Sequence, residues 1–375
     1  MDDKSLPNGM SEDELIQSKQ PNTEVEYLRA QVRKRDSIIL KQRNRIGQLE
    51  DVSELFGDTI RSLPPPSGFD FRMPDKLGVS PAMAHLCLSD FHAEETIDPE
   101  EMEGYANFNW DIFRARAWRS VTKTVELVDL LRHGQEIREL SVFLLGDMVT
   151  GDIHADAERT ASMPLPIAIV ELADVIAQMV NYLSAHFEVV KVVGVCGNHG
   201  RKDFKPVSKQ KVDRNWDSSV YHIARKITRE NSRIEWLLPR SPAVVVGVLG
   251  ADLLLKHGDG IKAQGVTPYY GLVRDTSREV IKRRKVQDFD YVIQGHLHHW
   301  GLVEGNRILC PSLIGPNQFS YDLLHSTYPP EQLLLFTTEH KGLISQHPIK
   351  LEGANGHGFI DDKLIKSDGC WVESE

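Results

Sequence analysis

The sequence predicts an α/β fold in which strands alternate with helices. Three runs of aliphatic and β-branched residues end at Asp90, Asp147 and Asn198, as buried strands do. Two stretches with helical spacing of apolar residues, 118–131 and 169–183, separate these runs. Such alternation is typical of sheets that are covered by helices. After about residue 240 the strand-like runs follow one another more closely, so the second half of the chain is expected to add mostly β structure.

Composition and charge limit the classes of protein to consider. The chain has 375 residues, is 41% hydrophobic and carries a formal net charge of -10, which suits a soluble protein of at most two domains. The acidic balance argues against a general binder of polyanions, although a basic patch can still form locally. We found neither a signal sequence nor a run of about 20 apolar residues, so a cytoplasmic protein without a membrane segment is expected. The four cysteines are widely spaced, and disulfides are not expected.

The texture of the sequence divides the chain into five segments. A polar start without periodicity predicts disorder, a heptad pattern follows, and three consecutive prolines, Pro64 to Pro66, end the predicted helix. The predicted segments are a disordered acidic tail over 1–24, a coiled-coil helix over 25–63, a Pro-rich linker over 64–78, the main domain over 79–352 and a C-terminal tail over 353–375.

The heptad pattern predicts a helix that associates with a second helix. The a positions are mainly β-branched (Val25, Val32, Ile39, Ile46, Ser53 and Ile60), and the d positions are mixed (Leu28, Arg35, Gln42, Leu49, Phe56 and Leu63). β-branched residues at a favour a parallel two-stranded coil, whereas Arg35 and Gln42 at d weaken it and could fix register or partner. We therefore expect a homo-oligomer. A single amphipathic helix docked on its own domain is the alternative.

Five short polar blocks occur in a fixed order, each directly after a strand-like run. They read SDFH, GDMVTGD, GNHG, KHGD and GHLHH, and they begin at Ser89, Gly146, Gly197, Lys256 and Gly295. In α/β proteins the chemistry gathers at strand ends. Asp, Asn and His are metal ligands, so the five blocks together indicate a site for two metal ions.

Taken singly, each block is weak evidence. The pair Asp90 and His92 could grip one cation, but a surface turn explains most such pairs. Asp147 ends a buried strand, where a carboxylate is costly unless a metal or hydrogen bonds compensate, so it could bridge two metals. A lone histidine is more often structural than a ligand. Five blocks of this kind, each at a strand end, make metal ligation a better explanation than a structural role.

These blocks resemble the calcineurin-like metallophosphoesterases, whose motifs run D-x-H, G-D, G-N-H, H and G-H-x-H. The resemblance covers about residues 79 to 350 and is closest in texture to phage and bacterial phosphoesterases and to the DNA-repair exonuclease branch. It implies an α/β sandwich of four layers, α-β-β-α, in which two mixed sheets are flanked by helices. By the same resemblance, His199 would be catalytic, and the metal ligands would be Asp90, His92 and His298 for the first ion, Asn198, His257 and His296 for the second, and Asp147 as the bridge.

The implied cofactors are two divalent metal ions. Manganese is the first expectation by resemblance, and iron, zinc or magnesium suit the same mixture of imidazole, carboxylate and amide ligands. Two cations about 3.5 to 4 Å apart lower the pKa of a bridging water and stabilise the charge of an in-line displacement. The predicted reaction is hydrolysis of a phosphodiester by the resulting hydroxide.

The chain departs from the family at the third block and after the bridging aspartate. Gly200 and Arg201 follow His199, where many members carry an acid, and Thr150 stands where protein phosphatases of the family have an aspartate. These departures argue against a protein phosphatase. Asp152 or His154 could replace the missing partner of the catalytic histidine.

The substrate prediction depends on a basic loop and two aromatic residues. Arg201 and Lys202 begin a loop rich in lysine and arginine that could follow a phosphodiester backbone. Tyr269 and Tyr270 follow soon after His257 and could stack on a base. Nucleic acid, or another phosphodiester, is the expected partner and a nuclease the expected activity. A small-molecule phosphatase or cyclic-nucleotide phosphodiesterase, and a non-catalytic scaffold, remain alternatives.

Overall fold

The computed structural model describes residues 23–62, 80–153, 159–261, 268–322, 328–340 and 342–360. Most of the predicted acidic tail (1–22), the Pro-rich linker, His154 and the last fifteen residues lie outside these ranges. The chain divides into two compact units, Met1–Asp75 and Lys76–Glu375.

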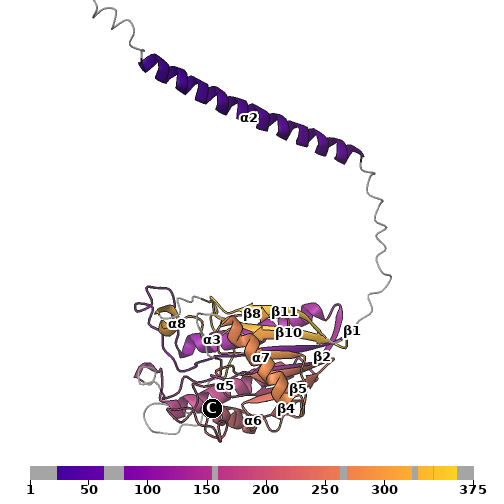
Figure 1. Cartoon of the computed structure of the whole chain (residues 1–375). Coiled ribbons are helices and arrows are strands. Elements are labelled where there is room, and N and C mark those ends of the chain that lie inside the picture. The colour runs from indigo at the N-terminus through magenta and orange to yellow at the C-terminus, as the bar shows by residue number, and fades with distance from the viewer. Residues whose placement is uncertain are drawn as a thin grey trace, which may run out of the picture. The chain divides into compact units, whose positions relative to one another are not determined.

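The described part of the first unit is one long helix. Helix α2 spans Thr23–Ser62, so its bounds agree with the predicted helix to within two residues (Figure 1). The helix continues without a break because its 40 residues contain neither proline nor a strand-like run. Apolar residues of its heptad pattern, including Val32, Ile39 and Ile46, are exposed. Pairing of this helix in a coiled coil stays a prediction.

The first sheet of the second unit has six strands in the order β11-β10-β1-β2-β3-β4. Neighbours from β1 to β4 are parallel, and β10 and β11 add antiparallel strands at one side. The bounds are β1 Ser80–Leu88, β2 Gln135–Leu144, β3 Val189–Gly194, β4 Ile234–Leu237, β10 Glu331–Thr338 and β11 Gly342–Lys350.

The second sheet has five strands in the order β5-β6-β7-β9-β8 and is also mixed. Its strands are β5 Ala243–Val248, β6 Ala251–Lys256, β7 Tyr291–Gln294, β8 Gly301–Val303 and β9 Arg307–Leu309. Glu304 and Gly305 have φ angles of 51° and 71°, which suit the tight turn of the β8–β9 hairpin. The expected crowding of strands after residue 240 is confirmed.

Side-chain alternation along the strands builds a core on each face of the first sheet. On β1, Cys87 belongs to a cluster shared with Leu253 and Ile293 of the second sheet, so this cluster joins the two sheets. Leu86 and Leu88 point the other way, into the larger cluster beneath the helices. This period of two is the normal alternation of a strand that is buried on both faces.

Helices complete the layers on the outer faces. Helices α3 (Trp110–Leu131) and α5 (Leu165–Ser184) contribute to the large core against the first sheet, joined by α6 (Trp216–Ile227). Leu272 of α7 (Tyr269–Arg283) packs on Val303 and Leu309 of the second sheet. The short helix α8 spans Gln318–Asp322. Two mixed sheets flanked by helices confirm the predicted α-β-β-α sandwich.

Helix α5 is long and apolar because it is a core helix. Among the described residues it alone has the length and composition to cross a membrane, and 61% of the window that meets this test is buried inside the protein. Ile169, Leu172, Ile176 and Val180 lie in the large core. Burial against the sheet and neighbouring helices accounts for its hydropathy.

Candidate metal centre

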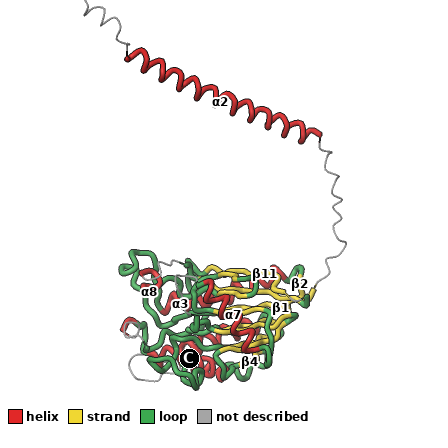
Figure 2. The backbone as a smooth tube through the Cα atoms, viewed as in Figure 1, coloured by secondary structure: helices red, strands yellow, loops and turns green. Residues whose placement is uncertain are grey.

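The five polar blocks meet at one end of the two sheets. Parallel strands β1, β2 and β3 end just before Asp90, Asp147 and Asn198, and the parallel pair β6 and β7 ends just before His257 and His296. Because parallel strands present their carboxyl ends at the same edge, the blocks gather there. Figure 2 shows loops crowded at this end of the strands.

The backbone of the site is strained where the side chains converge. Asp90, His92, Asp147, His296 and His298 have φ angles of 50°, 46°, 52°, 71° and 58°, in the left-handed region that non-glycine residues rarely adopt. Each such residue costs on the order of 1–3 kcal/mol and persists only where the surroundings hold it. Residues of this kind cluster at functional sites, so the strain supports a role for these loops beyond chain reversal.

One group of possible ligands consists of Asp90, His92 and His298, whose ligand atoms lie within 4.8 Å of one another. Asp90 is fully buried, and one of its oxygens lies 3.3 Å from the Nε2 atom of His298. The other oxygen accepts hydrogen bonds from the backbone N–H of His296 (3.0 Å) and from the Ser89 hydroxyl. The fifth block is thereby tied to the first.

The imidazole of His92 is oriented as a metal ligand would be. Its Nδ1 atom lies 3.1 Å from the Thr150 hydroxyl, which donates in turn to Glu95 (3.1 Å), so Nδ1 carries the proton. The Nε2 atom is buried and has no hydrogen-bond partner among the described residues. Burial, and the neighbouring His199, lower the pKa of His92 to about 3. A neutral ring with an unpaired Nε2 turned into a donor cluster fits a cation.

A second group consists of Asp147, His257 and His296, again with ligand atoms within 4.8 Å. The Nδ1–H of His257 donates to the carbonyl of Leu145 (2.8 Å), which directs its Nε2 atom into the site. That Nε2 lies 2.8 Å from an Asp147 oxygen and 3.1 Å from the Asn198 side-chain oxygen. All four residues predicted to surround the second ion are therefore adjacent.

Asp147 also belongs to a third group, with His92 and His199. Its Oδ1 atom accepts the backbone N–H of His199 at 2.7 Å, and the rings of His92 and His199 meet edge to face with centroids 4.8 Å apart. Asp147 thus lies between the two ligand groups, at the place predicted for a bridging carboxylate. His199 lies beside the first group, and its catalytic role remains a prediction.

The charges of Asp147 and His257 stabilise each other, as the pKa values of both groups show. Burial raises the pKa of Asp147, but His257 and His199 outweigh this effect, and the net pKa lies well below the usual value. Burial lowers the pKa of His257, yet the Asp147 carboxylate raises it to about 10 overall. The raised pKa of His257 shows that the Asp147 carboxylate favours a positive charge at this position, as it would favour a divalent cation.

Sequence reasoning missed Glu95, a carboxylate beside His92. Glu95 accepts hydrogen bonds from Thr150 (3.1 Å) and Asn317 (3.0 Å), and one of its oxygens lies 3.7 Å from His92 Nδ1. Thr150, which stands where protein phosphatases of the resembled family carry an aspartate, therefore connects His92 to an acid three residues further along the same loop. The available signal was the acidic pair that begins two residues after His92.

The second missed residue is Asp217 at the start of α6. Its carboxylate is fully buried and accepts the backbone N–H groups of Asp147 (3.0 Å), Met148 (3.1 Å) and Gly197 (2.8 Å). The neighbouring Asn215 caps the helix and donates to the carbonyl of Gly197. Residues from one helix start thus hold the second and third blocks together. No local pattern in the sequence indicates these long-range partners.

Asp152 and His154 are the two candidates from the sequence for a partner of His199. The Asp152 side chain is exposed, and His154 lies outside the described residues. Thr150, Glu94 and Glu95 fill the buried space next to His92 instead, with Glu94 accepting the N–H of Gly151 at 2.9 Å. Burial raises the pKa of Glu94 to about 7.

The predicted substrate residues are mostly on the surface around the site. Arg201 is half-buried and donates to backbone carbonyls, including that of Asn198 at 2.9 Å, so it supports the loop. Lys202 is exposed, with its ammonium 4.0 Å from the ring centroid of Trp216. Tyr269 and Tyr270 are exposed at the start of α7, and Tyr269 donates to Glu304.

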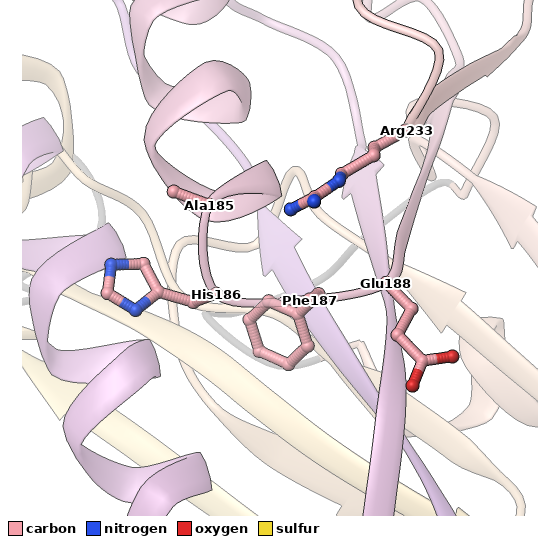
Figure 3. Close-up of a pocket in the computed structure, with 5 residues that line it drawn as sticks. All are labelled: Ala185, His186, Phe187, Glu188 and Arg233. Carbon is pink, nitrogen blue, oxygen red and sulfur yellow. The ribbon is translucent and has the colours of Figure 1, made fainter.

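A separate cavity of about 350 Å³ lies at the other end of β3 (Figure 3). It is lined by Ala185, His186, Phe187, Glu188 and Arg233. These residues precede β3 or β4, whereas the polar blocks follow the strands. The cavity is therefore not part of the metal centre.

Comparison with known proteins gives weak similarities only. No protein-family model matches the chain, and no curated protein matches its sequence. Among solved structures, Vps29 of Entamoeba histolytica, complexed with zinc, is 16% identical with a TM-score of 0.26; the match covers 72% of this chain and 100% of that one. Vacuolar Protein Sorting 29 of Cryptosporidium parvum is 12% identical with a TM-score of 0.28, over 72% and 98% of the two chains. A dimetal phosphatase of Danio rerio is 10% identical with a TM-score of 0.35, over 72% and 100%. At these values the neighbours transfer no function to this chain.

Proposed function

We propose that this protein is a calcineurin-like metallophosphoesterase that uses two divalent metal ions to hydrolyse phosphodiester bonds, with nucleic acid as its substrate. The observation that carries the proposal is the convergence of seven predicted ligands from five loops, with Asp147 between two groups of donors. Left-handed backbone at five of these residues adds weight, because that strain is not needed to turn a chain.

Bound ions would activate water and stabilise charge on the phosphoryl group. The chain's own residues would do the rest. His92 and His257 have their Nδ1 protons engaged by Thr150 and Leu145, so each directs its Nε2 atom into the site. His257 would release its Nε2 proton on binding a metal. His199 lies next to His92, where its imidazole could donate a proton to a leaving oxygen. Manganese is the proposed metal, as the resemblance implies.

A polymeric substrate is supported by the surface next to the third block. Lys205, Lys209 and Lys211 are exposed on the loop that follows His199, together with Phe204, which is 74% exposed. Tyr270 is 86% exposed. Exposed cations with exposed aromatic rings are what single-stranded nucleic acid contacts, through its phosphates and its bases.

A small phosphodiester is the second candidate, because part of the basic loop is already neutralised. Arg214 forms two hydrogen bonds of 2.7 Å with Asp203. Arg201 is engaged by backbone carbonyls. Fewer free cations remain than the sequence indicated, and a short anionic substrate needs fewer.

Hydrolysis assays separate these candidates. The manganese-supplied protein would be given bis-p-nitrophenyl phosphate, p-nitrophenyl phosphate, cyclic nucleotides and labelled single- and double-stranded DNA. We expect cleavage of the diester and of DNA, and a loss of about 100-fold or more in both for His199→Ala. The variant Lys209→Glu should weaken DNA cleavage while leaving the small diester unaffected, because a surface lysine contacts only a long substrate.

Each contrary outcome has a definite meaning. Cleavage of diesters and cyclic nucleotides but not of DNA would overturn the nucleic-acid assignment. Activity on the monoester alone would overturn the phosphodiesterase assignment. No metal-dependent hydrolysis of any substrate would favour a scaffold role for the domain.

A further inference from the structure

Helix α2 presents an apolar stripe that no other described residue of its own compact unit covers. Val32, Ile39 and Ile46 repeat at heptad spacing along it and are 55%, 46% and 54% exposed. Val25 and Leu28 extend the stripe toward the N-terminus and are also exposed. A 40-residue helix with such a stripe is stabilised when a second helix covers it.

A parallel pair with a second copy would be unfavourable at two layers. In a parallel, in-register homodimer each d residue faces its own copy. Arg35 would then face Arg35 of the partner subunit, and Gln42 would face Gln42 of the partner subunit. Two guanidinium groups at one core layer repel each other and must both stay hydrated, which interrupts the seam near its middle.

An antiparallel pair removes this conflict. We propose that α2 pairs with α2 of a second copy in the antiparallel direction, with Arg35 beside Ile46 of the partner subunit and Ile39 beside Gln42 of the partner subunit. In antiparallel coils an a residue packs against a d residue, so each polar d side chain meets an aliphatic one. The stem of Arg35 can then lie along Ile46 while its charged end reaches water.

The charges that flank the seam select this register. At the e positions it sets Arg29 opposite Glu50 of the partner subunit, and Asp36 opposite Arg43 of the partner subunit. Twofold symmetry doubles these to four attractive pairs. A shift of one heptad in one direction brings Arg43 opposite its own copy, and a shift in the other brings Arg29 opposite Arg43.

The parallel alternative has the same number of attractive pairs along its flanks. There Glu24 lies opposite Arg29 of the partner subunit and Arg45 lies opposite Glu50 of the partner subunit, which symmetry makes four pairs. Charge therefore sets the register of the antiparallel pair but does not decide the direction. Both arrangements bury the same aliphatic residues, so the Arg35 layer decides between them.

Distances between spin labels on the full-length protein test the direction. The described native cysteines, Cys87, Cys196 and Cys310, are buried, and Cys370→Ser removes the remaining one. Single labels are then placed at Glu26→Cys and at Lys41→Cys, outside the seam. In the proposed register the two labels at 41 lie within one turn, whereas those at 26 are separated along the axis by about 44 Å, at 1.5 Å per residue.

A parallel dimer predicts the same short distance at both positions, and that result would overturn the proposal. Absence of a dipolar interaction at 41 would overturn it as well, because the helices would then not pair. Charge reversal gives an independent check by sedimentation. Glu50→Arg should weaken the dimer, and adding Arg29→Glu should restore it, whereas restoration by Arg45→Glu instead would indicate the parallel arrangement.

Discussion

Asp147 shows how one side chain can organise a site. Its Oδ1 atom accepts the His199 N–H at 2.7 Å, and its Oδ2 atom lies 2.8 Å from His257 Nε2. Its own backbone N–H is fixed by Asp217, and its φ angle of 52° turns the carboxylate inward. A carboxylate buried in this way and surrounded by imidazoles is costly without a cation or protonated neighbours to share its charge.

Replacement of Glu95 should weaken metal binding. It receives the hydrogen bond that Thr150 passes on from His92, so Glu95→Gln should leave the ring less well oriented. Loss of such an outer partner lowers metal affinity or activity by about 10- to 100-fold. Manganese binding measured by titration calorimetry would detect this change.

Asp152→Asn is the matched comparison for that variant. Asp152 is exposed, and its substitution should leave manganese affinity unchanged. If Asp152→Asn lost manganese affinity while Glu95→Gln kept it, Asp152 and not Glu95 would be the acid that orients the histidine.

At the scale of elements, the site depends on where loops are tied. Gly197 must be glycine, because a Cβ atom there would lie 2.2 Å from the Asp147 Oδ1 atom. The same close approach lets Asp217 of α6 bind both loops at once. Helix α6 therefore acts as a brace between the ends of β2 and β3, although none of its side chains is a predicted ligand.

Asp217→Asn should weaken this brace. An amide offers one acceptor oxygen where the carboxylate offers two, so at least one of three buried N–H groups loses its partner, at about 1–3 kcal/mol. Denaturant unfolding would show the loss, and manganese affinity should fall with it. Asp213→Asn, on the preceding loop and paired with exposed Arg240, should change stability by less than about 1 kcal/mol. Equal effects of the two substitutions would contradict the brace.

For the whole molecule, the sequence was sufficient where local pattern determines structure. Strand runs ending at Asp90 and Asp147 and the long N-terminal helix could be read from periodicity. The gathering of the five blocks followed from the rule that parallel strands end together.

What the sequence could not supply is contact between distant loops. Glu95 meets Thr150 55 positions away, and Asp217 meets Asp147 70 positions away. Neither pair leaves a periodic trace, because each depends on the angle at which two loops leave the sheet. For the same reason the basic loop has fewer free cations than its composition indicates, since Asp203 neutralises Arg214.

We propose that the domain binds two metal ions where the carboxyl ends of its two sheets meet. The most direct test is the number of manganese ions bound per chain at equilibrium, measured for the protein and for His298→Ala and His257→Ala. These residues belong to different ligand groups that share no histidine. We predict about two ions for the unaltered protein and about one for each variant. A stoichiometry of one or zero for the unaltered protein, or no loss in either variant, would contradict the two-metal centre.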